Sequence, residues 1–129
     1  MNEVVAARRG VEMVGQHVRM TVVWSVTPGK VTTINAALNS LMVATRVVPG
    51  CIGCTLSTEL GDQAEFQYIE EWKTEADLIN QIRSSRFSKL AHLMEHATER
   101  PRVEFVVRGE SHGIEYAEEV RGTKEREDL

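Results

Sequence analysis

At 129 residues, with 42% of them hydrophobic and 26% charged, the chain has the size and composition of one globular domain with its own core. The formal net charge is −4 at pH 7 and acidic and basic residues are interspersed, so nucleic acid is not an expected partner. No apolar run approaches the roughly 20 residues that span a bilayer, and Arg8 and Arg9 follow the short apolar stretch at residues 4–7 instead of preceding it, so we expect no membrane segment, no signal peptide and a cytoplasmic protein.

The first regular element expected is a strand, which follows an N-terminal arm at residues 1–16. From His17 onward apolar residues alternate with others, which is the period of a strand with a buried face. The set on one face consists of Val18, Met20, Val22, Trp24 and Val26. A Thr-Pro-Gly-Lys turn at residues 27–30 ends this strand.

The hydrophobic period then changes to that of a helix of about four turns. Its predicted buried stripe consists of Ile34, Leu38, Leu41 and Thr45. The helix ends before Pro49, because a proline disfavours helical conformation in the residue that precedes it. Two strands joined by a turn at residues 60–62 follow, and we expect them at residues 51–59 and 64–72.

A capped helix opens the second half of the chain. Thr74 can accept hydrogen bonds from the free backbone N–H groups, and acidic residues in the first turn suit the positive end of the helix dipole. A serine pair at residues 84–85 separates this helix from a second helical piece, and a last strand is expected at residues 103–107. Residues 109–129 form an extension, which is either a solvated tail or an arm packed on a partner subunit.

The order of these elements is β-α-β-β-α-β. Two helical crossovers around a central hairpin are typical of a ferredoxin-like α+β fold with a four-stranded antiparallel sheet. We therefore predict one such domain at residues 17–108. Right-handed crossovers place both helices on the same face of the sheet, which leaves the other face without a cover.

The uncovered face favours a homodimer. Val23 and Ile69 are apolar residues on the opposite side of their strands from the aromatic set, so neither face is expected to be fully polar. Monomers seldom expose large contiguous apolar patches. A second copy packed sheet against sheet would cover this face and give a dimeric α/β barrel.

Cys51 and Cys54 form a C-x-x-C pair. A redox pair needs its first cysteine at a helix N-terminus, where the dipole lowers the thiol pKa, but this pair runs into a predicted strand. A zinc site would need two more ligands at suitable spacing, and the sequence offers none. Structural thiols are therefore favoured, with a redox or metal role as the alternative.

The strand at residues 64–72 carries the clearest candidate for chemistry. Phe66, Tyr68, Glu70 and Trp72 alternate onto one face, so a carboxyl group lies between aromatic side chains. Desolvation there would raise the pKa of the carboxyl group and prepare it for general acid or base work near neutrality. The alternative is that Glu70 caps the next turn or pairs with an arginine across the dimer.

Three motifs in this order resemble the pattern of the antibiotic biosynthesis monooxygenase (ABM) superfamily. They are Pro-Gly-Lys at residues 28–30, Pro-Gly-Cys-Ile-Gly at residues 49–53 and Tyr-Ile-Glu-Glu-Trp-Lys-Thr-Glu-Ala at residues 68–76. The resemblance covers residues 17–107 and implies the same dimeric ferredoxin-like fold. Active members include cofactor-free monooxygenases that act on quinols and polyketide phenols.

The resemblance also implies a mechanism and a set of site residues. In such enzymes the protein deprotonates the phenol or quinol and holds the anion in a dry pocket, where it reduces dioxygen without metal, flavin or another cofactor. Glu70 becomes the acid or base candidate, and the substrate-binding walls would be Trp24, Phe66, Tyr68 and Trp72. Tyr68 stands where some members carry an asparagine. Gln81 and Ala91 replace the tryptophan and histidine of haem-degrading members, which disfavours haem.

His92 is the second catalytic candidate, as a base or anion partner in the pocket. The alternative, which is favoured from the sequence, is a partly exposed helical residue. The leading hypothesis is a cofactor-independent monooxygenase that takes a small aromatic or quinol-like molecule and dioxygen. The alternatives are a non-catalytic dimeric module that binds a small apolar ligand and a structural dimer without a ligand. A catalytic Glu70 predicts an open cavity that contains it, whereas a structural dimer would fill that space.

Overall fold

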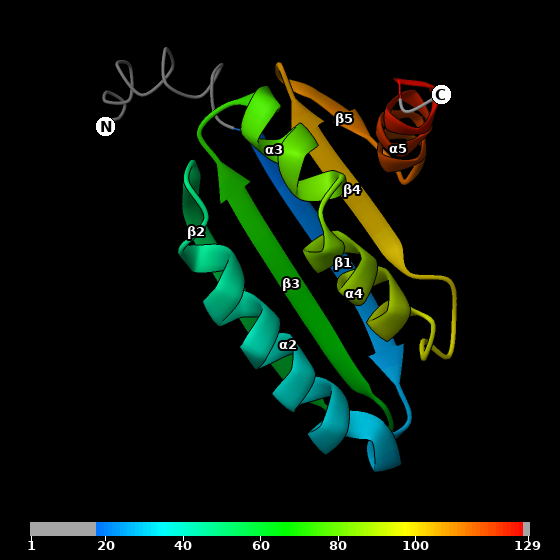
Figure 1. Ribbon diagram of the computed structural model, residues 1–129. Coiled ribbons are helices and arrows are strands. Elements are labelled where there is room, and N and C mark those ends of the chain that lie inside the picture. The colour runs from blue at the N-terminus through cyan, green and yellow to red at the C-terminus, as the bar shows by residue number, and fades with distance from the viewer. Residues whose placement is uncertain (1–17, 128–129) are drawn as a thin grey trace, which may run out of the picture.

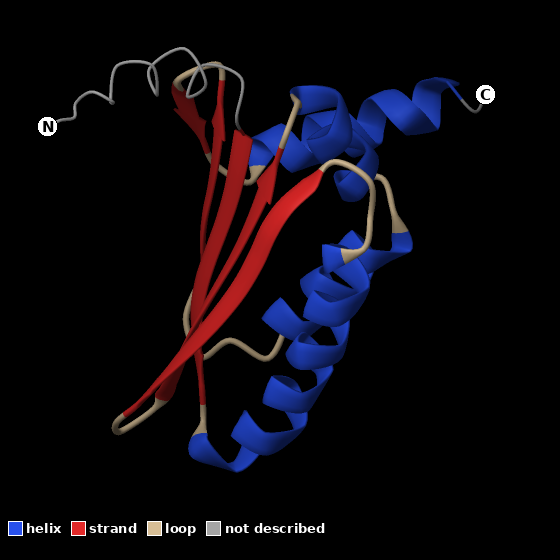
Figure 2. Cartoon of the chain, turned by 90° about the vertical axis from the view of Figure 1, so that its left-hand side faces the viewer, coloured by secondary structure: helices blue, strands red, loops and turns tan. Residues whose placement is uncertain are grey.

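The protein has two layers, in which helices cover one face of an antiparallel sheet (Figure 1). This computed structural model describes residues 18–127, so the predicted arm at residues 1–16 lies outside the described residues. In chain order the elements are β1 (Val18–Val26), the 3-10 helix η1 (Pro28–Lys30), α2 (Val31–Arg46), β2 (Cys51–Leu60), β3 (Ala64–Trp72), α3 (Glu75–Ile82), α4 (Ser85–Met94), β4 (Arg102–Val107), β5 (Glu110–His112) and α5 (Glu115–Glu127). Figure 2 shows the layers from the side, with α2, α3 and α4 together on one face of the sheet. None of the helices described is long and apolar enough to cross a bilayer.

Five strands form one antiparallel sheet in the order β2-β3-β1-β4-β5. The first four strands and the helical crossovers confirm the predicted ferredoxin-like βαββαβ arrangement. The fifth strand differs from the predicted four-stranded sheet. Arg108 and Gly109 have positive φ values of 53° and 76°, which is the conformation of a two-residue hairpin turn. This turn places Glu110 opposite Val107, so β5 pairs although its sequence has no apolar alternation.

The core lies between the sheet and the helices. β1 and β3 point alternate side chains toward the helical layer, and every inward side chain on these two strands is at most 3% exposed. The helices contribute Ile34, Leu38, Leu41, Leu78, Ile82, Phe87 and Leu90. Trp24 packs on Phe66 with ring centroids 5.5 Å apart. The strict period of two in both strands thus explains why this face of the sheet is almost wholly apolar.

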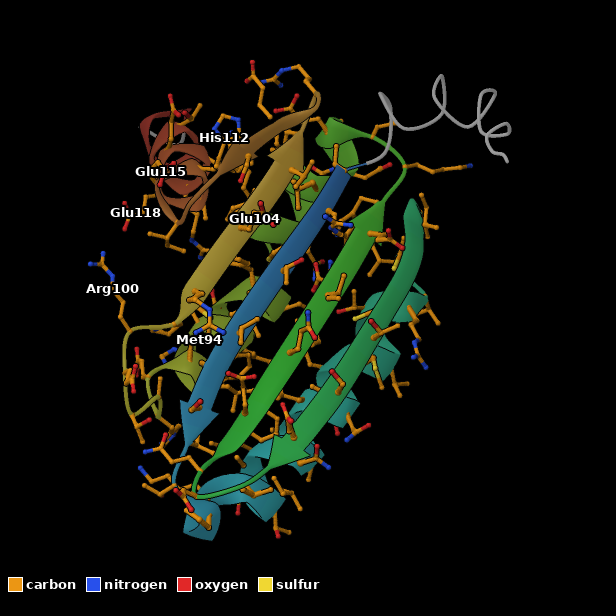
Figure 3. All side chains as sticks on the ribbon, turned by 180° about the vertical axis from the view of Figure 1, so that it is seen from behind. Met94, Arg100, Glu104, His112, Glu115 and Glu118 are labelled. Atoms are coloured by element: carbon orange, nitrogen blue, oxygen red, sulfur yellow. The ribbon has the colours of Figure 1, made fainter. Side chains whose placement is uncertain are left out.

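The opposite face of the sheet is not covered by any described element (Figure 3). The aromatic side chains of β3 all point toward the helices, so none of them adds apolar surface to this face. Its apolar side chains are the half-buried Val23, Ile69 and Val106, and charged residues such as Arg19 and Glu104 surround them. The face is therefore a mixed surface, on which a polar or charged residue of the neighbouring strand lies opposite each apolar one.

The C-terminal segment packs on its own domain, so the expectation of a solvated tail is wrong for residues 115–121. Tyr116, Ala117 and Val120 of α5 are buried. The Tyr116 ring lies 5.2 Å from that of Phe105, and Arg121 donates hydrogen bonds to the Ile82 carbonyl and to Ser88 Oγ. The sequence from Glu118 onward is densely charged, which is typical of a solvated tail, but one apolar stripe is enough to attach the helix.

The turn between α2 and β2 requires a glycine at position 50, which a substitution can test. The φ of Gly50 is 91°, and a Cβ atom there would overlap the Asp77 carboxyl group. We expect Gly50→Ala to lower the free energy of unfolding by about 2 kcal/mol, because both the conformation and the space favour glycine. Urea unfolding measures the loss. Gly29→Ala is the control, since a Cβ atom at Gly29 meets nothing within 4 Å; equal losses in the two variants would contradict the prediction.

Candidate functional site

A buried polar cluster surrounds the Glu70 carboxyl group. Glu70 is 1% exposed, and the alternation of β3 places it between Tyr68 and Trp72 on the inward face. Tyr68 Oη donates to Glu70 Oε2 over 3.0 Å, and Trp72 Nε1 donates to Oε1 over 3.1 Å. Gln81 of α3 donates from Nε2 to Glu70 Oε2 over 3.2 Å and to Thr45 Oγ1 over 3.4 Å. We call Thr45, Tyr68, Glu70, Trp72 and Gln81 the Glu70 cluster.

Burial controls the protonation of this cluster. Desolvation raises the pKa of Glu70 above its usual range, although the hydrogen bonds from Trp72, Tyr68 and Gln81 and the charge of Arg86 oppose part of this effect. Desolvation, reinforced by the neighbouring Glu70, also raises the pKa of the Tyr68 phenol. The predicted direction of the Glu70 shift therefore agrees with its surroundings.

A hydrogen-bonded path leads from the Glu70 cluster toward the surface. Arg86 of α4 is half-buried and donates from Nε to Gln81 Oε1 over 2.9 Å, while the Gln81 amide nitrogen donates to Glu70. Gln81 thus has both ends of its amide occupied, and it fixes the position of the guanidinium group. Gln81 therefore links the buried Glu70 to the half-buried Arg86.

Arg86 lies in the wall of a groove between α2 and α4. The groove has a volume of about 410 Å³, which falls within the range of small-molecule sites. Its lining consists of Ala37, Ser40, Leu41, Ala44, Arg86, Lys89, His92 and Leu93. Small and apolar side chains come mainly from α2, and the three basic residues come from α4. The arrangement offers an apolar surface with cationic and titratable groups along one wall.

The family of the protein follows from a sequence match over the region that contains both the Glu70 cluster and the groove. Residues 17–93 match the profile of the family described as Antibiotic biosynthesis monooxygenase. The chain belongs to the ABM family. The match extends from the start of β1 nearly to the end of α4, so every residue of the Glu70 cluster and of the groove lies within it. No curated protein matches the chain in sequence.

Solved structures support the ABM fold. A conserved protein from Methanosarcina mazei is 26% identical, with a TM-score of 0.65, and the match covers 75% of this chain and 97% of that one. A protein from Mycobacterium tuberculosis is 21% identical, with a TM-score of 0.61 and coverages of 70% and 93%. A structure described as an antibiotic biosynthesis monooxygenase is 20% identical, with a TM-score of 0.61 and coverages of 68% and 94%. The latter two likenesses concern the fold alone.

The predicted site residues fall into two separate groups in this ABM-family chain. Glu70, Tyr68 and Trp72 are hydrogen-bonded together, and Phe66 and Trp24 pack on each other further along the same face. All five are at most 2% exposed and none lines the groove, so the cavity predicted around Glu70 is closed by side chains. Their catalytic and substrate-binding roles stay predictions.

His92 forms the second group, apart from the first. It lines the groove, its side chain is 75% exposed, and its Nδ1 lies 3.8 Å from Glu95 Oε1. Arg86 and Lys89 line the same groove as His92, but neither was among the site residues predicted from the sequence. Their spacing of three residues along α4 was a usable signal, because residues at i, i+3 and i+6 share one side of a helix.

The two cysteines are free and lie beside the Glu70 cluster. Burial raises the pKa of the Cys54 thiol to about 12 despite a hydrogen bond with Tyr68, and burial also raises the pKa of Cys51. A redox-active thiolate requires the opposite shift. Within residues 18–127 no three histidine, cysteine, aspartate or glutamate side chains are grouped closely enough to hold a metal ion.

Proposed function

We propose that this ABM-family protein is a cofactor-independent monooxygenase that oxidises a phenolic or quinol-type small molecule in the groove between α2 and α4. The observation that carries the proposal is the groove itself, because it combines an apolar surface of suitable volume with a histidine in its wall. A flat aromatic ring would lie against Leu41 and Ala44, with its hydroxyl group toward α4.

The proposed chemistry draws its electrons from the substrate. His92 accepts the phenol proton, and the resulting phenolate transfers electrons to dioxygen. In the oxidation of a methylene group next to the ring, one oxygen atom becomes the new carbonyl and the other leaves as water with the two hydrogens of the methylene. Electrons and atoms then balance without a further reductant. A positioned acid or base typically contributes 10²–10⁴-fold to such a reaction.

Glu70 has an indirect role in this proposal. It is enclosed and has no contact with the groove, so we assign it as a positioning residue that holds Arg86 through Gln81. The aromatic residues Trp24, Phe66, Tyr68 and Trp72 support that arrangement as the packed floor beneath the helices. Direct contact between any of them and a ligand would require the core to open.

Oxygen uptake with a panel of quinols and anthrone-like phenols tests the proposal. We expect His92→Gln to reduce kcat by about 100-fold or more, because it removes the proton acceptor. His96→Gln is the matched control, since His96 is also exposed and does not line the groove. Glu70→Gln should lower activity less than His92→Gln. Uptake by none of the panel, or equal rates in the two histidine variants, would contradict the proposal.

Blocking the groove gives a second test of its location. Ala44→Phe places a ring into the groove and should abolish oxygen uptake, whereas Ala36→Phe puts the same ring on an exposed position of α2 outside the groove. Far-ultraviolet circular dichroism checks that both variants keep the fold. Equal activity in both would place the reaction elsewhere.

We also propose that the protein is a homodimer packed sheet against sheet. Its support is the uncovered sheet face, on which Val23, Ile69 and Val106 are half-buried. Light scattering coupled to gel filtration should give a mass near twice 14.5 kDa, and a monomer at micromolar concentration would exclude this assembly.

A non-catalytic module that binds a small apolar ligand is the second candidate. One observation favours it: the Glu70 carboxyl group already accepts hydrogen bonds from three side chains and does not line the groove. Binding that Ala44→Phe blocks, without oxygen uptake from any substrate, would identify this function.

A further inference from the structure

The groove between α2 and α4 is basic although the chain as a whole is acidic. The formal net charge of the protein is −4, yet none of the eight residues that line the groove is acidic and three are arginine, lysine or histidine. Glu95 lies about one turn further along α4, with its Oε1 3.8 Å from His92 Nδ1, and it does not line the groove. The lining of this groove therefore carries positive charge without a compensating acidic residue.

The two cationic side chains in the wall of the groove, Arg86 and Lys89, differ in how firmly they are held in place. Arg86 is half-buried, and its Nε is held by Gln81 Oε1 at 2.9 Å, which fixes the plane of the guanidinium group. Lys89, one turn along α4, has no hydrogen bond or ion pair with any residue of the part of the chain that the structure describes. One cation is thus positioned in advance, and the other can reach toward a ligand.

We infer that the groove selects an apolar aromatic molecule that carries a permanent negative charge such as a carboxylate, which Arg86 and Lys89 recognise. The inference rests on the proposed function for the location of the site and adds the class of its ligand. A neutral quinol would meet the apolar half of the groove and give neither Arg86 nor Lys89 an anionic partner.

Three physical effects support this assignment. Leu41, Leu93 and the alanines of α2 give the ring of the ligand an apolar contact surface. An Arg86 guanidinium group with a fixed plane loses little freedom when it binds a carboxylate through two hydrogen bonds. Glu70 takes its hydrogen bonds from Tyr68, Trp72 and Gln81 and not directly from Arg86, so it does not occupy the guanidinium group that faces the ligand.

A matched pair of probes tests the inference apart from any reaction. 2-Naphthoate and 2-naphthamide have the same ring and nearly the same shape, and neither is a phenol or quinol, so calorimetric titration measures binding alone. We expect the carboxylate to bind at least about 10-fold more tightly at low ionic strength, and the preference should fall as salt is added because exposed charges are screened. Ala44→Phe should remove the binding of both probes.

Substitutions of the cationic residues test whether Lys89 and Arg86 recognise the carboxylate. Lys89→Gln should reduce the preference for the carboxylate severalfold and leave the affinity for the amide unchanged, whereas Arg86→Lys keeps the charge and loses the two-pronged geometry. Lys73→Gln is the control, because it makes the same change in net charge at an exposed lysine outside the groove. Equal affinities for the two probes, no binding of either at millimolar concentration, or equal effects of Lys73→Gln and Lys89→Gln would overturn the inference.

The outcomes separate this inference from the proposed reaction. If 2-naphthoate binds in a Lys89-dependent way but no phenol or quinol consumes oxygen, the monooxygenase proposal fails and the anion site stands. If neutral phenols are oxidised as fast as their carboxylated analogues, with no effect of Lys89→Gln, the reaction stands and the anion site fails.

Discussion

Replacement of Glu70 by alanine should destabilise the protein by about 3–5 kcal/mol, because it leaves buried donors unpaired and also opens a cavity. Tyr68 Oη, Trp72 Nε1 and Gln81 Nε2 all donate to this carboxyl group in the interior. Glu70→Gln keeps the volume and one acceptor oxygen, so its loss should be clearly smaller. Urea unfolding of both variants measures the difference.

The pH dependence of the free energy of unfolding separates the contribution of the Glu70 ionisation from that of its packing. Burial raises its pKa in the folded protein above the usual value of 4.5, so the native state binds this proton more tightly than the unfolded chain. The resulting stabilisation is complete below pH 4.5 and is lost as the pH rises through the folded pKa. The free energy of unfolding of the wild type should therefore fall relative to Glu70→Gln over that window.

The difference between wild type and Glu70→Gln is the informative quantity. Other carboxyl groups have opposite shifts, for example Glu75, where hydrogen bonds from Tyr116 and Arg108 outweigh the effect of burial and lower the pKa. These groups are present in both proteins and cancel in the difference. Parallel pH profiles for the two proteins would show that the Glu70 pKa is the same in the folded and unfolded states.

Removal of the Tyr116 side chain should have an effect of similar size, about 3–5 kcal/mol for Tyr116→Ala, because a buried aromatic ring is lost from the contact between α5 and the sheet. The ring is 9% exposed and packs on Phe105, and the hydroxyl group donates to Glu75 Oε2 over 2.6 Å. Tyr116→Phe keeps the ring and removes only this hydrogen bond, so about 1 kcal/mol is expected from the control.

Denaturant unfolding followed by tryptophan fluorescence measures both Tyr116 variants. A loss below 1 kcal/mol for the alanine variant would mean that α5 is not docked in solution. Tyr116→Phe removes only the hydrogen bond to Glu75, whereas Tyr116→Ala removes the ring as well. The two losses together show how much of the attachment of α5 depends on packing and how much on this hydrogen bond.

Much of the fold follows from local patterns. The period of two in β1 and β3 and the period near 3.6 in α2 need no knowledge of distant residues, so the elements, their order and the ferredoxin-like arrangement could be predicted. The β4–β5 hairpin could not, because it depends on positive φ values at Arg108 and Gly109 and not on an apolar pattern. The same is true of α5, where a short buried stripe outweighs a high density of charge.

Part of the candidate site could also be predicted from local patterns, and part of it depends on tertiary packing. Alternation along β3 was sufficient to place Glu70 between aromatic side chains and to predict the direction of its pKa shift. Its enclosure depends on Gln81, which reaches it from α3 and turns the expected open pocket into a closed cluster. The groove forms where α2 and α4 pack together on the sheet, and it brings Ala44 close to Arg86. Patterns within one element show which way a side chain points, but a cavity is the space left between elements far apart in the chain, so its position and charge emerge only when those elements pack.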